Sequence, residues 1–201
     1  MNTIGQLYRQ YDPWVKHPDL FSGSLHGESV GITLRPFFIP EDFHFYNEWL
    51  NHDADSPGNL SSAFSENYFL AVLESSNAQS LWGLIDGEPA FGLELYKAVQ
   101  YHAPDEIKNL RLQSGDVMMQ IVIAPWIMND NKLSEYVLPA CLKYIFTYSG
   151  TERLLLVLDR DSLVYIRLAR QAKPFHSYVS EDKKVIYEYR EALSPEGFFR
   201  K

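Results

Sequence analysis

The stretch "DVMMQIVIAPWIMNDNKLSEYVLPACLKYIF" at residues 116–146 decides the fold of this 201-residue chain. Its first part, 116–124, is apolar and rich in β-branched residues and predicts a buried strand, and the apolar spacing over about 133–148 predicts a helix. Residues 153–159 predict a second buried strand, and 162–172 predict a further helix. A strand, a helix and a strand in this order indicate two parallel strands joined by a crossover.

The rest of the chain predicts a mixed central sheet flanked by helices, which places the fold in the α/β class in the broad sense that includes α+β. The strongest local signal is Asp86-Gly87 between two apolar runs, because this dipeptide favours a tight hairpin turn. The other predicted elements are a strand in 28–37, helices at 40–53 and about 62–75, the hairpin at 80–96, a loop at 98–114 and a final hairpin at 175–191.

The chain is acidic, with a formal net charge of −8 and a pI near 5.2. A surface that binds nucleic acid or an anionic membrane needs a basic face, so we expect neither partner. A local basic pocket could still bind an anionic small molecule. The length suits one domain, or one domain with a short N-terminal extension.

Cysteine content and hydropathy predict a cytoplasmic protein. The single cysteine, Cys141, excludes an internal disulfide and indicates a reducing compartment. Its place in an apolar helical run favours a buried structural thiol over a nucleophile. The start, "MNTIGQLYRQYDPWVKH", lacks an apolar core of signal-peptide length, and "RLLLVL" at 153–158 is too short to span a bilayer.

Three stretches are more specific than these patterns. They are "RPFFIPEDFHFYNEWLN" (35–51), "LIDGEPAFGLELYKA" (84–98) and "YIFTYSGTERLLLVLDRDSLVYIRLARQA" (144–172). Together with the element order, they resemble the N-hydroxylysine acetyltransferase-like proteins, the siderophore-biosynthesis branch of the GNAT acyltransferase superfamily. The similarity covers roughly residues 30–190, and the second stretch is its most specific part.

The resemblance implies a fold, an activity and a domain plan. The sheet is expected to splay into a V between the strands near 116–124 and 153–159, where acyl-CoA would bind. Residues 1–28 would be an extension, 29–193 the acyltransferase domain, and 194–201 a tail. The implied reaction moves an acetyl or other acyl group from acetyl-CoA or another acyl-CoA to a small-molecule amine, by direct attack without a covalent enzyme intermediate.

The acceptor implied by the resemblance is an N-hydroxylated diamine or N-hydroxylysine. A hydroxylamine nitrogen is less basic than an alkylamine, so it is largely neutral at physiological pH and a strong general base is less necessary. Two alternatives stay open: a GNAT enzyme with another acceptor, such as a peptide or antibiotic amine, and a non-catalytic binding or partner protein that has lost CoA binding. The protein is expected to be a monomer or a homodimer.

The resemblance assigns cofactor contacts to the strand at 116–124 and to the turn and helices after it. The implied contacts are Val122, Ile123, Ala124, Asn129, Asn131, Lys132, Ser134 and Ser162. The first three would offer backbone groups to the pantetheine arm. The pyrophosphate would bind backbone N–H groups where the helix dipole favours anions.

The turn departs from the family pattern because it contains no glycine, the residue that lets a backbone approach a phosphate and adopt positive φ. Asn129 and Asn131 tolerate the left-handed conformation and could partly replace glycine, and Lys132 could supply positive charge. Asp130 would repel a pyrophosphate, and Pro139 would kink a helix that starts near Ser134. A modified CoA loop and an ordinary strand-to-helix turn both remain open.

Three residues are candidates for catalysis. Asp159 matches the family's acid and would act as a base or orient the amine; its alternative is a cap for the next helix, a role for which Asp161 competes. Gln120 replaces a histidine that is frequent in the family and can orient a substrate but cannot accept a proton. Ala169 replaces the family's proton-donating tyrosine, and Tyr165, one turn earlier, either substitutes for it or packs as an ordinary aromatic.

The candidate substrate contacts are Glu94, Tyr96 and Trp49. Glu94 and Tyr96 face away from the neighbouring leucines of their strand, and an acid on an apolar strand is costly unless it is paired. The alternative for Glu94 is an ion pair with Arg35 or Arg153, and for Trp49 it is core packing. We expect no metal, because the histidines lack metal-ligand spacing and there is only one cysteine.

Overall fold

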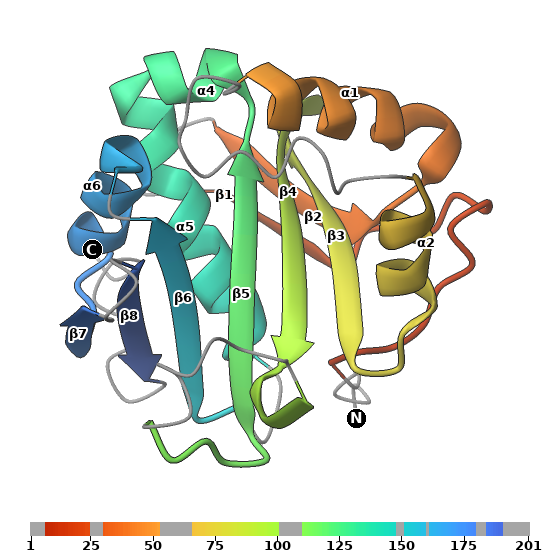
Figure 1. The fold of residues 1–201 in the computed structure, drawn as a ribbon. Helices are drawn as coiled ribbons and strands as arrows, with labels where there is room; N and C mark the ends of the chain where they lie inside the picture. The colour runs from red at the N-terminus through yellow and green to blue at the C-terminus, as the bar shows by residue number, and fades with distance from the viewer. Residues whose placement is uncertain are drawn as a thin grey trace.

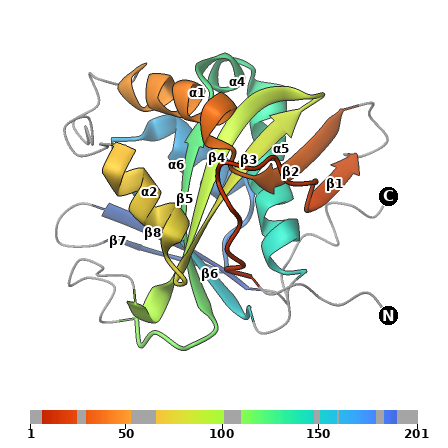
Figure 2. The ribbon, with the colours of Figure 1, turned by 90° about the vertical axis from the view of Figure 1, so that its right-hand side faces the viewer.

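The described part of the chain forms one mixed eight-stranded sheet with helices on both faces (Figures 1 and 2). The computed structural model describes residues 7–24, 30–52, 66–100, 110–147, 151–159, 161–179 and 184–190. The strands are β1 (Phe21–Ser24), β2 (Gly31–Pro36), β3 (Ala78–Ile85), β4 (Glu88–Lys97), β5 (Asp116–Ile123), β6 (Arg153–Asp159), β7 (His176–Val179) and β8 (Lys184–Arg190). The helices are α1 (Ile39–His52), α2 (Glu66–Glu74), the short 3₁₀ helix η2 (Ala98–Gln100), α4 (Pro125–Asn129), α5 (Asn131–Ile145) and α6 (Leu163–Gln171).

The order of the strands confirms the predicted mixed sheet with a parallel crossover. The order is β1-β2-β3-β4-β5-β6-β8-β7, in which β5 and β6 are parallel and every other neighbouring pair is antiparallel. The crossover from β5 to β6 runs through α4 and α5. Figure 2 shows α1 and α2 on one face of the sheet and α5 on the other.

The predicted splay is present between β5 and β6. Their parallel register runs only from Asp116 opposite Arg153 to Met119 opposite Leu156. Beyond that point β5 stays paired with β4 as far as Ile123, and β6 stays paired with β8 as far as Asp159. The two strands therefore diverge at their carboxyl ends, which Figure 1 shows at the top of the sheet.

The predicted turn at Asp86-Gly87 is confirmed. Both residues have positive φ, 51° and 87°, which is the geometry that a two-residue hairpin turn requires. The Asp86 carboxylate also accepts a hydrogen bond from the Gly31 N–H (2.7 Å), which fixes the turn to β2.

The junction after β5 differs from the predicted loop. Residues 125–129 form the short helix α4, and α5 begins at Asn131, earlier than expected. Pro139 therefore lies deeper inside α5 than the second turn, and the helix continues through it to Ile145. Strand β1 was not predicted; it lies within the segment expected to be an extension and pairs with β2. The division at 1–28, 29–193 and 194–201 stays a prediction, and 194–201 lie outside the described residues.

The core contains the one cysteine. Cys141 on α5 is fully buried, as a structural thiol would be, and burial raises its pKa.

Among the described helices, none has the length and hydropathy that crossing a membrane requires.

Candidate functional site

The open end of the splay exposes one edge of β5 to ligands. Residues of a strand turn their backbone groups alternately to the two neighbouring strands. The Ala124 N–H donates to the Ala90 carbonyl on the β4 side (2.8 Å), so the Ile123 N–H points toward the β6 side. By the same alternation the Val122 N–H faces β4 and the Ile121 N–H faces the opening. Of the three predicted contacts, the structure therefore turns the backbone N–H of Ile123 into the splay.

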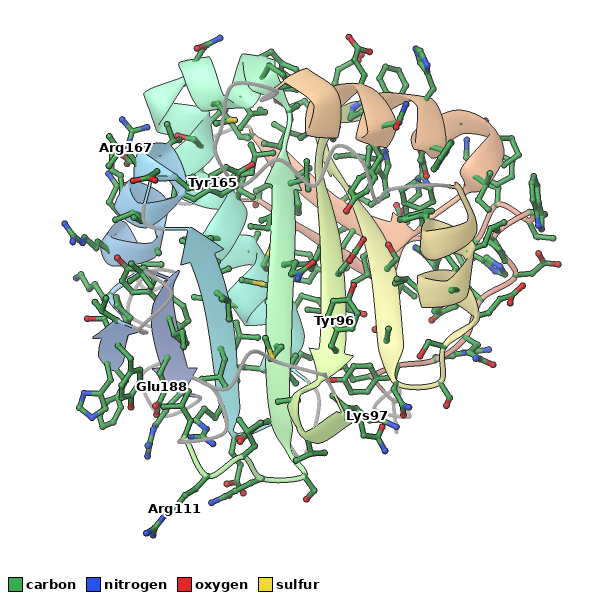
Figure 3. All side chains as sticks on the ribbon, viewed as in Figure 1. Tyr96, Lys97, Arg111, Tyr165, Arg167 and Glu188 are labelled. Atoms are coloured by element: carbon green, nitrogen blue, oxygen red, sulfur yellow. The ribbon has the colours of Figure 1, made fainter. Side chains whose placement is uncertain are left out.

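Tyr165 lies at this opening. Its phenol oxygen accepts the hydrogen bond from the Ile123 N–H (3.1 Å), which joins α6 to the end of β5. Figure 3 shows Tyr165 on the side of α6 that faces β5. Ala169, one turn later, is fully buried, and its carbonyl accepts a hydrogen bond from the Tyr189 hydroxyl (2.8 Å). The structure thus brings Tyr165 to the predicted place, while its part in catalysis stays a prediction.

Asp130 occupies the N-terminus of α5. Its carbonyl accepts the Ser134 N–H (3.0 Å), and its carboxylate accepts the Leu133 N–H (3.0 Å), so Asp130 is the N-cap of the helix. An N-cap carboxylate takes a donor that a bound anion would otherwise use. The sequence led us to expect that Asp130 would repel a pyrophosphate, which stays a prediction, but it did not reveal the cap.

The other residues predicted to form the CoA loop do not build a turn with the positive φ that glycine adopts. Asn129 ends α4 and Asn131 begins α5, and neither is among the described residues with positive φ, so they do not reproduce the backbone conformation of a glycine here. Ser134 is completely buried. The side chains of Asn131 and Lys132 lie outside the described residues. Ser162 is the N-cap residue of α6, but its side chain makes no capping hydrogen bond.

Glu94 is buried on the α1 face of the sheet, where two tyrosine hydroxyls donate hydrogen bonds to it. One carboxylate oxygen accepts the Tyr46 hydroxyl (2.8 Å) and the other accepts the Tyr96 hydroxyl. Burial raises the pKa of Glu94, and the hydrogen bonds from Tyr96 and Tyr46 oppose that shift. Gln120 is its cross-strand partner in β5, so the acid lies beside the strand that borders the opening.

Arg35 and Trp49 both have partners other than Glu94 and a substrate. Arg35 pairs with Asp42 (2.6 Å), so it does not pair with Glu94. Trp49 is buried and stacks on Trp82, with ring centroids 4.8 Å apart and planes at 7°. Trp49 therefore packs in the core, which was the alternative to its role as a substrate contact.

Tyr46 was missed as the partner of Glu94, although the sequence carries a signal for it. Gly92 lies two residues before Glu94 on the same face of β4, and a Cβ at Gly92 would come within 2.5 Å of the Tyr46 ring. The glycine leaves the space through which Tyr46 of α1 reaches the acid. Gly92, two residues before the buried Glu94, was therefore a sign in the sequence that an aromatic side chain crosses β4 at this point.

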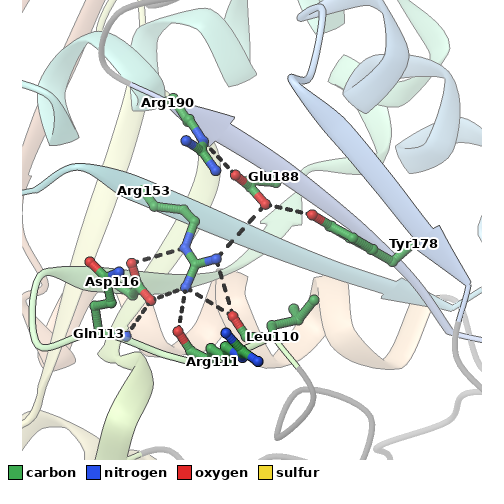
Figure 4. A network of polar contacts seen from close by, with 8 residues as sticks. All are labelled: Leu110, Arg111, Gln113, Asp116, Arg153, Tyr178, Glu188 and Arg190. Carbon is green, nitrogen blue, oxygen red and sulfur yellow. Dashed lines mark hydrogen bonds and ion pairs between the residues drawn. The ribbon is translucent and has the colours of Figure 1, made fainter.

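Arg153 holds β5 to β6 at the closed end of the splay (Figure 4). Its guanidinium donates two hydrogen bonds to the Asp116 carboxylate, one of them from Nε (3.0 Å), and lies 3.9 Å from Glu188 of β8. Glu188 also accepts hydrogen bonds from the Tyr178 hydroxyl (2.8 Å) and from Arg190 (2.6 Å). The hydrogen bonds to Asp116, together with its negative charge, raise the pKa of Arg153, while burial opposes the shift. The cluster fixes the strand pair from which the splay opens.

Asp159 is the last residue of β6 and lies opposite Lys184 of β8 in the register. Its side chain lies outside the described residues, so its role as base or cap stays a prediction. Within the part of the chain that the structure describes, no three His, Cys, Asp or Glu side chains gather as metal ligands.

Comparison with solved structures shows the same fold. A structure of the aminoglycoside acetyltransferase AAC(6')-Ib in complex with coenzyme A is 18% identical, with a TM-score of 0.64, and the match covers 81% of this chain and 96% of that chain. An uncharacterized protein from Bacillus halodurans is 16% identical, with a TM-score of 0.72 and coverage of 89% and 93%. A chimera of the spermidine N-acetyltransferase SpeG from Vibrio cholerae and hSSAT is 14% identical, with a TM-score of 0.61 and coverage of 82% and 98%.

No curated protein matches the chain. At these identities the solved structures show the fold alone. The family model described as the acetyltransferase (GNAT) domain matches residues 39–173, which is well over half of the chain and includes both strands of the splay. The chain therefore belongs to the acetyltransferase (GNAT) domain family and is an N-acetyltransferase of that family with an acyl-CoA as co-substrate.

Proposed function

We propose that this N-acetyltransferase acylates a small-molecule amine, and that the acceptor is an N-hydroxylated amine of the N-hydroxylysine or N-hydroxydiamine class. One observation supports the splay as the place of reaction. The Ile123 N–H points into the splay and donates a hydrogen bond to the Tyr165 hydroxyl there. The siderophore-biosynthesis context rests on the resemblance of the hairpin at 84–98 and the stretches at 35–51 and 144–172.

The geometry supports a direct transfer. A thioester carbonyl that replaces the Tyr165 phenol at the Ile123 N–H would find a fixed donor for the negative charge that develops on its oxygen. The amine nitrogen forms a bond to the carbonyl carbon, and the C–S bond breaks. The Tyr165 hydroxyl, released from Ile123, can then donate its proton to the departing thiolate and regain one from the acylated nitrogen by way of solvent.

The residues beside the opening favour a weakly basic acceptor. Gln120 cannot accept a proton at neutral pH. Both oxygens of Glu94 accept tyrosine hydroxyls, and the acid is buried, so it is poorly placed to take a proton from an ammonium group. A hydroxylamine nitrogen reaches the site already neutral and needs no strong base. Two solved neighbours support a small-molecule amine: they are complexes of the aminoglycoside acetyltransferase AAC(6')-Ib with ribostamycin and with paromomycin.

The experiment is an acetyl-transfer assay with matched acceptor pairs. N-hydroxylysine is compared with lysine, and N-hydroxycadaverine with cadaverine, at pH 6 to 9 with acetyl-CoA as donor. We expect the hydroxylated member of each pair to react faster at pH 7, with a rate nearly independent of pH. An alkylamine with a pKa of about 10.4 should instead speed up about tenfold per pH unit, because its neutral fraction rises. Faster reaction of the alkylamines, aminoglycosides or spermidine at pH 7 would reject the hydroxylamine acceptor and keep the transferase.

Asp159 is tested in the same assay. If it orients or deprotonates the acceptor, Asp159→Asn should lower kcat with the preferred acceptor while the KM for acetyl-CoA stays the same. Asp161→Asn is the matched control, because Asp161 is an exposed acid close by in the chain. Equal effects of the two variants would assign Asp159 to capping or to general electrostatics.

One observation favours a second candidate function, a partner protein that no longer transfers acyl groups. Asp130 occupies the N-terminus of α5, and Tyr165 occupies the Ile123 N–H, so two donors that a cofactor would use are engaged by the chain itself. Acylation of any amine at a rate that depends on enzyme concentration rejects this candidate. We place the reaction in the cytoplasm, where acyl-CoA and a reduced Cys141 are both expected, and monomer or homodimer stays a prediction.

A further inference from the structure

Three backbone donors at the junction between β5 and α5 are used inside the chain. The N–H groups of Ile127 and Met128 donate to the Ala124 carbonyl (3.0 and 3.1 Å), and the Asp130 N–H donates to the Ile127 carbonyl (3.0 Å). Pro125 at the start of α4 has no N–H to offer. A concave nest of backbone N–H groups, the arrangement that binds phosphate, needs such donors to point outward. In α4 they close a short helix instead.

The N-terminus of α5 is also engaged. It follows β5 and α4 in the chain, and the N-terminus of a helix attracts anions through its unpaired N–H groups and its dipole. Here the Leu133 N–H donates to the Asp130 carboxylate and the Ser134 N–H donates to the Asp130 carbonyl. One turn further, Glu135 accepts a hydrogen bond from Gln171 (2.9 Å), which links α5 to α6. The two described acids at this end of α5 would both repel a diphosphate.

The opening between β5 and β6, unlike the start of α5, keeps backbone groups that a ligand could pair with. It keeps the backbone groups that an extended, amide-containing ligand would pair with, since the β5 edge is unpaired by β6 beyond Met119 and the Ile123 N–H faces inward. Among the residues whose side chains are described, the opening therefore suits the pantetheine arm and thioester of an acyl donor, and the acids at the start of α5 do not suit the diphosphate of CoA.

We propose that this enzyme selects its acyl donor by the pantetheine thioester alone, and that Asp130 is a specificity-determining residue that discriminates against the CoA diphosphate. The substrate class is acyl-pantetheine thioesters, whatever is attached to the far end of the pantetheine arm. The inference rests on the proposed function, since it concerns the donor of the same reaction. Acyl-CoA is accepted as a member of the class, with little binding energy from its nucleotide.

The test compares three donors that share one acyl group: acetyl-CoA, acetyl-4′-phosphopantetheine and acetyl-pantetheine. For the wild-type enzyme we expect kcat/KM for acetyl-CoA to lie below that for acetyl-pantetheine, by up to about tenfold, because the shared arm supplies the recognition and Asp130 repels the diphosphate. A hundredfold or larger preference for acetyl-CoA would overturn the inference while leaving the acetyl transfer intact. A marked preference for acetyl-4′-phosphopantetheine over acetyl-pantetheine would show that the phosphate is recognised and would also overturn the inference.

The variant Asp130→Asn tests the assigned residue without removing the cap, because asparagine and aspartate are equally good N-cap residues. We expect kcat/KM for acetyl-CoA to rise about tenfold and kcat/KM for acetyl-pantetheine to stay the same, since removing one charge beside a diphosphate relieves repulsion of that order. Glu152→Gln is the matched control. It removes the same charge from an exposed acid beside Arg153 at the closed end of the splay and should change neither value. An unchanged donor ratio in Asp130→Asn would overturn the role of Asp130.

Calorimetric titration with pantetheine and with 3′-phospho-ADP keeps the inference testable even if no acyl transfer is found. Binding of pantetheine without binding of 3′-phospho-ADP supports it. Binding of 3′-phospho-ADP at submillimolar concentration, or binding of neither molecule, would overturn it. Failure of transfer with all three donors would instead reject the proposed function.

Discussion

Replacing Arg153 by methionine should destabilise the protein more than any other change in the charge cluster of Figure 4. The guanidinium is 14% exposed and compensates two carboxylates, Asp116 and Glu188, whose side chains are 3% and 1% exposed. Methionine keeps most of the aliphatic packing but leaves Asp116 buried without its cation, while Glu188 keeps only the half-exposed Arg190. Breaking a buried pair by removing one partner costs about 3–5 kcal/mol. With a urea slope of about 2 kcal/mol per M, the unfolding midpoint should fall by about 1.5–2.5 M.

Arg190 supplies the control within the same cluster. It also pairs with Glu188 (2.6 Å), but its side chain is 47% exposed, so water can replace it. Arg190→Met should therefore cost at most about 1 kcal/mol. The measurement is urea unfolding of the two variants followed by circular dichroism at pH 7. Equal losses in both variants, or a loss below about 1 kcal/mol for Arg153→Met, would refute the argument that burial of the uncompensated carboxylates decides the cost.

Three further changes test the site. Burial raises the folded-state pKa of Glu94, so stability from its protonated form is present below the ordinary value of 4.5 and is lost as pH rises through the raised value. Glu94→Gln should thus gain stability relative to wild type with rising pH, by up to about 1.4 kcal/mol per pH unit in that window; parallel melting-temperature curves from pH 4 to 9 would contradict this. Gly92→Ala, which forces Tyr46 away from Glu94, should cost about 2–4 kcal/mol in urea unfolding, and Tyr46→Phe, which removes only the hydrogen bond, should cost less. Tyr165→Phe should lower kcat about a hundredfold without raising the KM for the thioester, because the proton donor is lost and the Ile123 N–H is freed; an unchanged kcat would show that Tyr165 only packs.

Local features of the fold were predictable because local chemistry determines them. Asp86-Gly87 required positive φ at two successive residues, and few dipeptides other than this type supply that. The apolar strands 116–124 and 153–159 with a helix between them required a parallel crossover. Helix α4 was not predictable in this way, since residues 125–129 are too few for a periodic pattern and the helix depends on packing of Ile127 in the core.

The opening between β5 and β6 was predictable, but the contacts of the residues around it were less so. The resemblance located the opening and Tyr165. The partners of Glu94 were not found, because Tyr46 lies 48 residues away and the sequence does not state which helix face crosses which strand. Arg153 was considered as a partner of Glu94, yet it binds Asp116, which is adjacent in the strand register and not in the chain. The cap by Asp130 required knowing that α5 begins at Asn131.

The short register between β5 and β6 creates two sheet edges inside a single sheet. An unpaired edge on the outside of a protein invites another chain to add a strand. These two edges face each other at an angle, so a neighbouring molecule cannot pair with them as it would with an outer edge, while a thin extended ligand can. Entry of such a ligand separates no strand from its neighbour, because the pairing beyond Met119 and Leu156 was never made. Such a ligand would lie along the β5 edge as a short added strand, and at Ile123 its carbonyl oxygen would replace the Tyr165 phenol oxygen.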